Sequence, residues 1–473
     1  MKDTHSITDQ LLTTITEYVH SYEITDPNLL DQAKVCLLDS LACAMLALKE
    51  EKCKGLLGPI LPGTIVPNGS RVPGTEFVLD PILASFNLGA MIRWLDFNDT
   101  WLAAEWGHPS DNISAILSVA DYMSQTSAMD MRKVLEAMIK AYEIQGILSL
   151  ENSFNSLGID HVILVKIASC ALSSWLLGGG KTQTLNAISH AWIDGQSLRT
   201  YRHGINTSSR KSWAAGDAAA RGVRLAWLAK HGETGYPQAL TTPLWGFEDA
   251  VMHGRPIIIK QPLDRYVMDN ILFKVEFPAE FHAQTALEAA ITLHPLVADK
   301  LDKISRIEVH TQAAAMKIIN KSGKLSNYAD RDHCLQYIVA VGLIYGNLDA
   351  NSYSDEFAAK DPRIDQIRAK IIVAEDLAYS RAYYDPQKRA IANSVQVFYQ
   401  DGSCSSKVEL YYPVGHKFRR EEAEPLLKKK YLQAIQPHFN QQQIETLQDL
   451  WAINVMELAQ IPVKQFMDMW TKK

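Results

Sequence analysis

The sequence predicts a mostly α-helical protein, with one large all-helical domain built from both chain ends and a smaller α+β lid domain inserted between them. Two observations lead to this prediction. Apolar residues recur at helical spacing over most of residues 1–268 and again over 417–473. Between these parts, residues 269–416 contain short runs of alternating apolar residues, which are typical of strands, among further helices.

The first helical part begins with a predicted capping box at Ser6 and Asp9, followed by apolar residues on one helix face from Ile7 to Tyr22. A second, more buried helix is predicted over 29–48. Residues 57–79 contain four prolines and four glycines, so we expect a long loop there. Further helices are predicted at about 81–95, 111–124, 130–147, 161–177, 182–198 and 213–231.

The inserted part contains the predicted strands. Residues 304–310 and 370–374 are each short and rich in branched apolar side chains. Alternating apolar residues on both sides of Asp401-Gly402 predict a β-hairpin. Helices are predicted at about 281–295 and 330–345, and helical patterns return over 419–469.

The composition is that of ordinary globular material, with 47% hydrophobic and 21% charged residues in a chain of 473. This length predicts roughly two to four domains. The net charge of −6 gives no reason to expect a nucleic-acid partner. The longest apolar stretch, 161–177, is interrupted by Lys166, and no apolar leader follows Met1. We therefore expect a cytoplasmic protein that does not bind a membrane.

Neither the cysteines nor the glycine-rich segment predicts a cofactor. The six cysteines are scattered and none forms a Cys-x-x-Cys pair, which is typical of reduced packing residues rather than of a metal site. Gly178–Thr182 resembles the end of a phosphate-binding loop, but Trp175 stands where that loop needs a glycine, and a helix precedes it. The sequence therefore predicts no metal and no other cofactor.

The segment 93–112 carries the densest set of reactive side chains. It combines one arginine, four acidic residues and one histidine with three tryptophans. Asp80-Pro81 and Pro109-Ser110-Asp111 each begin an apolar helix, so this loop is held between two buried helix ends. Polar groups held inside a core must be satisfied or used. A satisfied polar turn and a functional loop are both open at this point.

A second candidate is the basic run 199–211, which contains no acidic residue. Guanidinium groups grip carboxylates, and helix N-termini attract anions, so we predict anion binding here; a solvated basic loop is the alternative. His161 begins an apolar helix, where a structural cap is the commoner role. Lys274 lies in an otherwise apolar segment and can simply extend to solvent, and His282 follows it.

The segment 94–112 resembles the motif of the family that contains 2-methylcitrate dehydratase and cis-aconitate decarboxylase; it reads WLDFNDTWLAAEWGHPSDN. The loop before His108-Pro109-Ser110 is longer than in the decarboxylase branch, which favours the dehydratase branch. The similarity extends through residues 155–166, 201–216, 277–285 and 331–346.

The resemblance implies dehydration of 2-methylcitrate to 2-methyl-cis-aconitate in propionate breakdown through the methylcitrate cycle, with citrate as a second substrate. Such a reaction needs cations for three carboxylates, a general base and a general acid. The resemblance places His161 and Lys211 in the substrate pocket, and Lys274 close to a family pocket lysine. The expected catalytic residues are Asp96, His108, His161, Lys211 and Lys274, and the expected substrate-binding residues are Arg93, Thr100, Arg202 and His282.

Several roles and activities stay open. His108 and His161 can act as base and acid in either order, and Asp96 can orient a histidine or act as the base itself. For Lys274 and His282 to join the other residues, the smaller domain must close over the helical one as a lid. The alternative functions are decarboxylation of cis-aconitate, epimerisation of a related dicarboxylate, and non-catalytic tricarboxylate binding. We also expect a homodimer.

Overall fold

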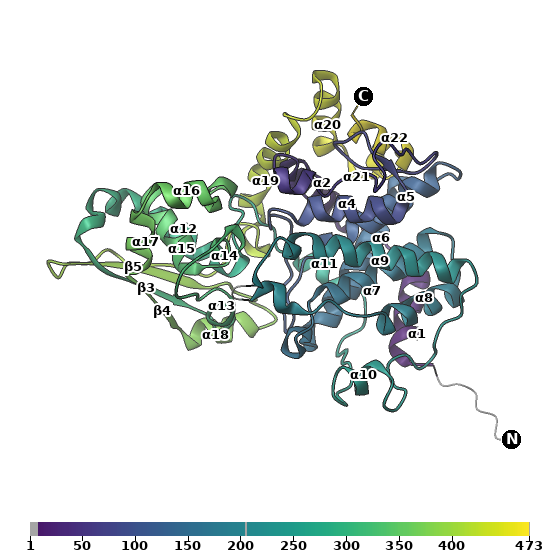
Figure 1. Ribbon diagram of the computed structural model, residues 1–473, viewed down its shortest axis with the longest axis horizontal. Helices are drawn as coiled ribbons and strands as arrows, with labels where there is room; N and C mark the ends of the chain where they lie inside the picture. The colour runs from purple at the N-terminus through teal and green to yellow at the C-terminus, as the bar shows by residue number, and fades with distance from the viewer. Residues whose placement is uncertain (1–7, 204–205, 473) are drawn as a thin grey trace. The chain divides into compact units, whose positions relative to one another are not determined.

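The computed structural model describes residues 8–203 and 206–472 (Figure 1). Contacts within the chain divide it into two units. The first unit comprises Met1–Arg202, Arg210–Ile271 and Leu427–Lys473, and the second comprises His203–Ser209 and Leu272–Leu426. The prediction of a mostly helical chain is confirmed. No helix of the described part is long and apolar enough to cross a membrane.

The first unit is built from helices. Its largest buried side chains include Trp101, Tyr142 and Trp192, so its core lies among these helices. Two-residue strands β1 (Ser70–Arg71) and β2 (Val78–Leu79) pair within the predicted long loop. The helices up to Ile271 are α1 (Gln10–Ser21), α2 (Pro27–Ala47), α3 (Glu51–Lys54), α4 (Pro81–Arg93), α5 (Ile113–Ser124), α6 (Met131–Glu151), α7 (Val162–Leu176), α8 (Lys181–Ile193), α9 (Arg210–Lys230), α10 (Phe247–Ala250) and α11 (Tyr266–Asn270), with 3-10 turns η1 (Pro109–Asn112), η2 (Phe154–Leu157) and η3 (Arg199–Arg202).

Close packing of α4 against α9 positions the loop that follows α4. A Cβ atom added at Gly89 would lie 2.5 Å from the Cα atom of Gly216, so only glycine allows these backbones to approach this closely. The Asp80 carboxylate caps the start of α4, as predicted. At the other end, the Ser212 hydroxyl of α9 donates to the carbonyl oxygen of Trp94 (3.1 Å). The loop therefore leaves α4 beside the first turn of α9.

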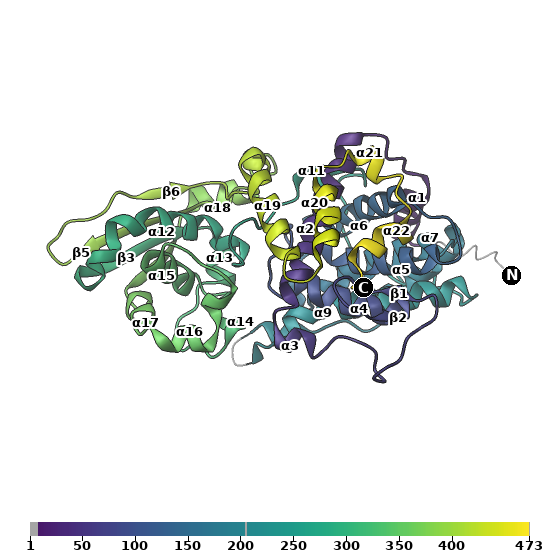
Figure 2. The ribbon, with the colours of Figure 1, turned by 90° about the horizontal axis from the view of Figure 1, so that it is seen from above.

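The C-terminal helices join the first unit, although they lie far from its other helices in sequence (Figure 2). Helix α21 packs against α2 and α22 packs against α5. The Arg71 guanidinium pairs with Asp121 of α5 and with Asp468 of α22. These helices are α19 (Arg420–Ile435), which belongs to the second unit up to Leu426, α20 (Gln441–Ala452), α21 (Val455–Leu458) and α22 (Val463–Trp470).

The second unit contains a four-stranded sheet in the order β4-β3-β5-β6. Strand β3 (Ile304–Thr311) is parallel to β4 (Ile371–Glu375) and antiparallel to β5 (Asn393–Tyr399), which pairs with β6 (Val408–Leu410). The predicted hairpin is confirmed, and Gly402 makes its turn with a φ of 86°.

Helices cover this sheet and complete the core of the second unit. Helix α12 (Gln284–Val297) packs against β5 and against α15 (Leu335–Tyr345) (Figure 1). The remaining helices are α13 (Ala313–Ile318), α14 (Tyr328–Arg331), α16 (Asp355–Lys360), α17 (Arg363–Arg368) and α18 (Leu377–Tyr384), with 3-10 turns η5 (Phe281–Ala283), η6 (Ala298–Lys303), η7 (Ala350–Tyr353) and η8 (Lys417–Arg419).

Two predicted helix ends are wrong. The helix predicted to reach residue 198 ends at Ile193. The chain turns there, and the buried ammonium group of Lys166 binds the carbonyl oxygen of Asp194 (2.6 Å). Ser6 of the predicted capping box lies outside the described residues. The Asp9 carboxylate does not cap its own helix; it accepts a hydrogen bond from the backbone N–H of Leu240 (2.7 Å) instead.

Candidate functional site

The loop that follows α4 is closed on itself. The backbones of Trp101 and Gly107 exchange two hydrogen bonds (2.8 and 3.0 Å), which bring its two arms together. The Trp101 indole donates to the carbonyl oxygen of Gly146 in α6 (3.1 Å), so the loop is also fixed to the helical core. Reactive side chains on such a loop are held on a rigid support.

Arg93, Asp96 and His108 form the first cluster of the predicted site. Asp96 has a φ of 51°, a left-handed conformation that turns the chain directly after α4. Its carboxylate lies 2.7 Å from Arg93 Nη1 and 3.7 Å from His108 Nε2. All three side chains are buried. Strained residues of this kind cluster at functional sites, which supports the prediction for Asp96.

The position of the His108 ring determines which nitrogen can exchange a proton. His108 Nδ1 lies 2.6 Å from the carbonyl oxygen of Asp99 and 3.4 Å from Thr100 Oγ1. Because a carbonyl oxygen only accepts hydrogen bonds, Nδ1 carries a hydrogen and donates it. Nε2, which faces Asp96, is therefore the nitrogen that accepts or releases a proton.

The His161 ring lies edge-on to the His108 ring, with 5.8 Å between the ring centroids. Both His161 nitrogens are buried and neither makes a hydrogen bond among the described residues, although Nδ1 lies 3.2 Å from Asp160 Oδ1. Gly107 makes room for this ring, because a Cβ atom there would lie 3.3 Å from His161 Cδ2. A buried ring nitrogen without a hydrogen bond, as Nε2 is here, is costly unless a ligand satisfies it.

Burial and the neighbouring charges keep His161 neutral. Burial lowers the pKa of His161 to about 3; Asp160 opposes this shift, and the positive charges of Arg202 and Arg199 add to it. His161 is therefore neutral near pH 7 and does not act as a proton donor in the free protein.

Asp160 is a buried carboxylate beside His161 that sequence reasoning missed. Its buried carboxylate accepts hydrogen bonds from Arg202 Nε and Nη2, and it lies 3.9 Å from Arg199 Nη1. Burial raises the pKa of Asp160, but Arg202 and His161 outweigh it and hold that pKa well below its ordinary value. The only sequence signal was an acidic residue directly before His161 at the start of an apolar helix.

This ion pair changes the interpretation of the basic run 199–211, of which residues 204 and 205 lie outside the described residues. The run contains no acid, yet the fold supplies Asp160 as a partner for Arg202. Asp160 also raises the pKa of Arg202 above its ordinary value, against the effect of burial. The role of Arg202 in substrate binding stays a prediction. Lys211 is buried in the first turn of α9, beside Ser212, which contacts the end of α4.

The loop itself carries two further buried carboxyl groups, Asp99 and Glu105. Asp99 accepts hydrogen bonds from Ser110 Oγ (2.6 Å) and from the Tyr142 hydroxyl (2.6 Å), and burial raises its pKa to about 6. Glu105 accepts from the backbone N–H of Asn155 (2.6 Å), and burial raises its pKa to about 7. These hydrogen bonds fix the loop to Tyr142 of α6 and to Asn155 of η2.

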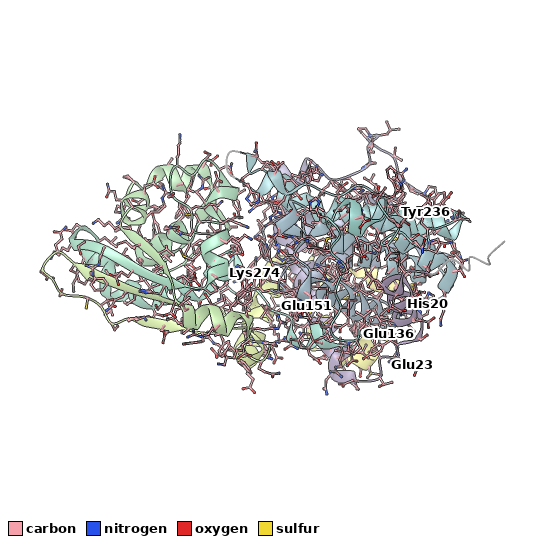
Figure 3. All side chains as sticks on the ribbon, turned by 90° about the horizontal axis from the view of Figure 1, so that it is seen from below. His20, Glu23, Glu136, Glu151, Tyr236 and Lys274 are labelled. Carbon is pink, nitrogen blue, oxygen red and sulfur yellow. The ribbon has the colours of Figure 1, made fainter. Side chains whose placement is uncertain are left out.

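Lys274, labelled in Figure 3, and His282 belong to the second unit. Lys274 is buried. His282 Nδ1 lies 2.8 Å from Glu280 Oε1, and its Nε2 lies 3.2 Å from the Tyr383 hydroxyl. With both nitrogens engaged inside its own unit, His282 is placed to support Glu280 and Tyr383. The closing of a lid, and a shared site of these residues with those of the first unit, stay predictions.

Comparisons with known proteins identify the family. The model of the MmgE/PrpD N-terminal domain matches residues 13–259, and that of the MmgE/PrpD C-terminal domain matches residues 277–453. The chain is 50% identical to the 2-methylcitrate dehydratase of Salmonella typhimurium and 51% identical to that of Cupriavidus necator, in both cases over 98% of this chain and 97% of the relative. It is 47% identical to the probable 2-methylcitrate dehydratase of Saccharomyces cerevisiae, over 98% of this chain and 93% of the relative. The chain belongs to the MmgE/PrpD family.

Proposed function

We propose that this chain is a hydro-lyase that dehydrates 2-methylcitrate to 2-methyl-cis-aconitate in propionate catabolism. The similarity to curated 2-methylcitrate dehydratases over nearly the whole chain supports this proposal. One observation of the site supports it most directly. The buried rings of His108 and His161 lie edge-on to each other, and each ring lies beside a carboxylate that is paired with an arginine. Such an arrangement provides both proton transfer and cationic groups for an anionic substrate.

We propose that His161 is the general base of the reaction. Its Nε2 makes no hydrogen bond in the described part of the chain, and the neutral ring has a lone pair available. The positive charges of Arg202 and Arg199 make it a weak base in the free protein. A substrate with three carboxylates brings negative charge next to these arginines, which raises the basicity of His161 when the substrate binds.

We propose that His108 is the general acid that protonates the departing hydroxyl group. Its Nδ1–H is fixed by Asp99, and the Asp96 carboxylate is placed to hold a proton on its Nε2. Arg93 and Lys211 are proposed to bind substrate carboxylates, and Thr100 to donate a hydrogen bond to one of them. Removal of a hydroxyl as water, rather than as hydroxide, is the step for which such an acid is needed.

A substrate assay tests the proposal. The purified chain is mixed separately with 2-methylcitrate, citrate and cis-aconitate, and ultraviolet absorbance follows the new double bond while carbon dioxide release is measured. We expect rapid absorbance growth with 2-methylcitrate and slower growth with citrate. Carbon dioxide release from cis-aconitate would instead favour the decarboxylase alternative. An altered diastereomer without a double bond would favour an epimerase, and binding without turnover would favour a tricarboxylate binder.

We also propose a cytoplasmic homodimer. Ile60, Leu61 and Ile65 are exposed on the loop before β1, and exposed apolar residues of this kind commonly mark contacts between subunits. Light scattering after size-exclusion chromatography tests the dimer, and a mass of one chain would contradict it. Because the relative from Yarrowia lipolytica is named as mitochondrial, cell fractionation must test the location.

A further inference from the structure

Asp111 is a buried acid whose surroundings do not suit a negative charge. It lies in η1, directly after the His108-Pro109 end of the loop, and its backbone N–H donates to the carbonyl oxygen of His108 (3.0 Å). Asp111 is fully buried. The charged groups that act on it are Arg93 of α4, Arg202 of η3 and Asp99 of the loop.

Both arginines near Asp111 already have carboxylate partners of their own. Arg93 pairs with Asp96, and Arg202 pairs with Asp160. From α6 and α7 the neighbouring side chains are uncharged: Gln145 and Ser169 hydrogen-bond to Asn112, the residue after Asp111. An ionised Asp111 would therefore be a third carboxylate beside two arginines that each already pair with another one, and it would lie close to Asp99.

Asn98 and Asp111 together leave two acceptor atoms without a donor. Asn98 Nδ2 donates to Asp111 Oδ1 (3.2 Å) and to Ser110 Oγ (2.9 Å), which uses both amide hydrogens. Asn98 Oδ1 and Asp111 Oδ2 are buried and have no hydrogen-bond partner among the described residues. One proton on Asp111 Oδ2 would satisfy both atoms, because a carboxylic acid and a primary amide form a cyclic pair with two hydrogen bonds.

We propose that Asp111 is a neutral carboxylic acid at neutral pH and forms such a cyclic pair with Asn98. Asn98 lies two residues after Asp96, and Asp111 lies three residues after His108. The pair therefore joins the two arms of the loop that carry these reactive side chains. Asp111 is thus a positioning residue for the proposed dehydration. The proposed protonation state does not depend on which reaction the chain catalyses.

The electrostatics agree with this geometry. Burial raises the pKa of Asp111 to about 8, although the charge of Arg93 opposes the shift, and the nearby Asp99 carboxyl adds to it. A buried polar network is stable only when each member has a partner. Hydrogen bonds connect Asp111 through Asn98 and Ser110 to Asp99. The added proton gives a hydrogen-bond partner to the two atoms of this network that otherwise have none, Asn98 Oδ1 and Asp111 Oδ2.

Two substitutions of Asp111 test the proposal. Asp111→Asn replaces a neutral acid with an amide of nearly the same shape, which offers a donor and an acceptor at the same two positions and one further N–H hydrogen. We expect it to keep the melting temperature and the kcat for 2-methylcitrate of the unmodified protein. Asp111→Ala removes the Asp111 partner of Asn98, and we expect kcat to fall roughly ten- to a hundred-fold with an unchanged circular dichroism spectrum. Activity retained in D111N and lost in D111A supports the pair.

A matched control is Asp121→Asn. Asp121 is equally buried, but its carboxylate pairs with the guanidinium of Arg71 (2.5 Å). Neutralising it takes away the buried one of the two carboxylates that pair with the Arg71 guanidinium, so we expect D121N to lower the melting temperature, whereas D111N does not. If D111N fails to fold, or loses as much stability as D121N, Asp111 is ionised and the proposal is overturned.

Infrared spectroscopy tests protonation without any substrate. The difference spectrum between the unmodified protein and D111N at pH 7 should lose the carbonyl band of a carboxylic acid. Loss of carboxylate bands instead would overturn the proposal. If the acid band is present and 2-methylcitrate is not converted, only the proposed function fails.

Discussion

Replacing Asp160 with asparagine tests the electrostatic design of the site most directly. Asp160 is the only carboxylate that the ion pairs place against both Arg202 and Arg199 in the described part of the chain. The side chains of Asp160, Arg202 and Arg199 are 0%, 8% and 9% exposed, so water compensates little of the lost charge. Asp160→Asn keeps the shape of the side chain, removes its charge and replaces one of the two oxygens that accept from Arg202 by an NH2 group.

Removing one partner of a buried ion pair typically costs about 3–5 kcal/mol of folding free energy, because an uncompensated charge remains inside. We expect a loss of this size in D160N. We also expect lower activity, since Asp160 is the group that opposes the lowering of the His161 pKa by the two arginines. Without it, His161 becomes a still weaker base.

Urea unfolding followed by circular dichroism measures the free energy of unfolding, and the substrate assay measures kcat. Asp194→Asn is the matched control, because Asp194 also pairs with two cations, Arg221 (2.6 Å) and Lys166 (3.5 Å), but its side chain is 33% exposed. We expect D194N to lose at most about 1 kcal/mol. Equal losses in D160N and D194N would refute the reasoning, and so would normal activity in D160N.

The pH dependence of stability gives a second test of Asp160. Its pKa in the folded protein lies below its ordinary value of 3.8, so the ionised group stabilises the folded state above that pH. This stabilisation is lost as the pH falls through the folded pKa. We therefore expect the difference in unfolding free energy between the unmodified protein and D160N to be constant near neutral pH and to shrink below about pH 4. A difference that grows on acidification would contradict this sign.

The remaining predictions concern the other proposed site residues and metal dependence. His108→Asn and His161→Asn should fold normally and each lower kcat roughly a hundred-fold, and normal kcat in both would move the acid–base role to Asp96 or a lysine. Lys211→Ala should cost on the order of 2–5 kcal/mol in kcat/KM, and an unchanged kcat/KM would remove Lys211 from the pocket. Exhaustive chelation should leave activity unchanged; activity that is lost and then restored by iron would show a metal requirement. Lys274→Ala should lower kcat/KM and leave the melting temperature nearly unchanged. A lower melting temperature with normal kcat/KM would assign Lys274 to the stability of its own unit.

Local sequence patterns determined most of the helices and the loop that carries the site. Asp80-Pro81 begins α4 as predicted, because capping and a preset φ act within one turn of the chain. The hairpin around Gly402 follows from alternation and turn chemistry, which are equally local. The density of reactive residues over 93–112 marked the loop, since so many polar groups between buried helices need partners or a use.

Only the tertiary structure decided which of these residues act together. Asp160 neutralises Arg202, although 42 positions separate them, and the sequence alone made the arginine part of an acid-free run. Lys166 of α7 binds the carbonyl oxygen of Asp194, directly after the end of α8, which local sequence patterns do not reveal. The charge of a carboxyl group inside a protein depends on its burial and on the charges that the fold brings near it. The spacing of residues in the local sequence determines neither of these. For this reason the sequence marked Asp111 only as a helix start, whereas the fold makes it the partner of Asn98.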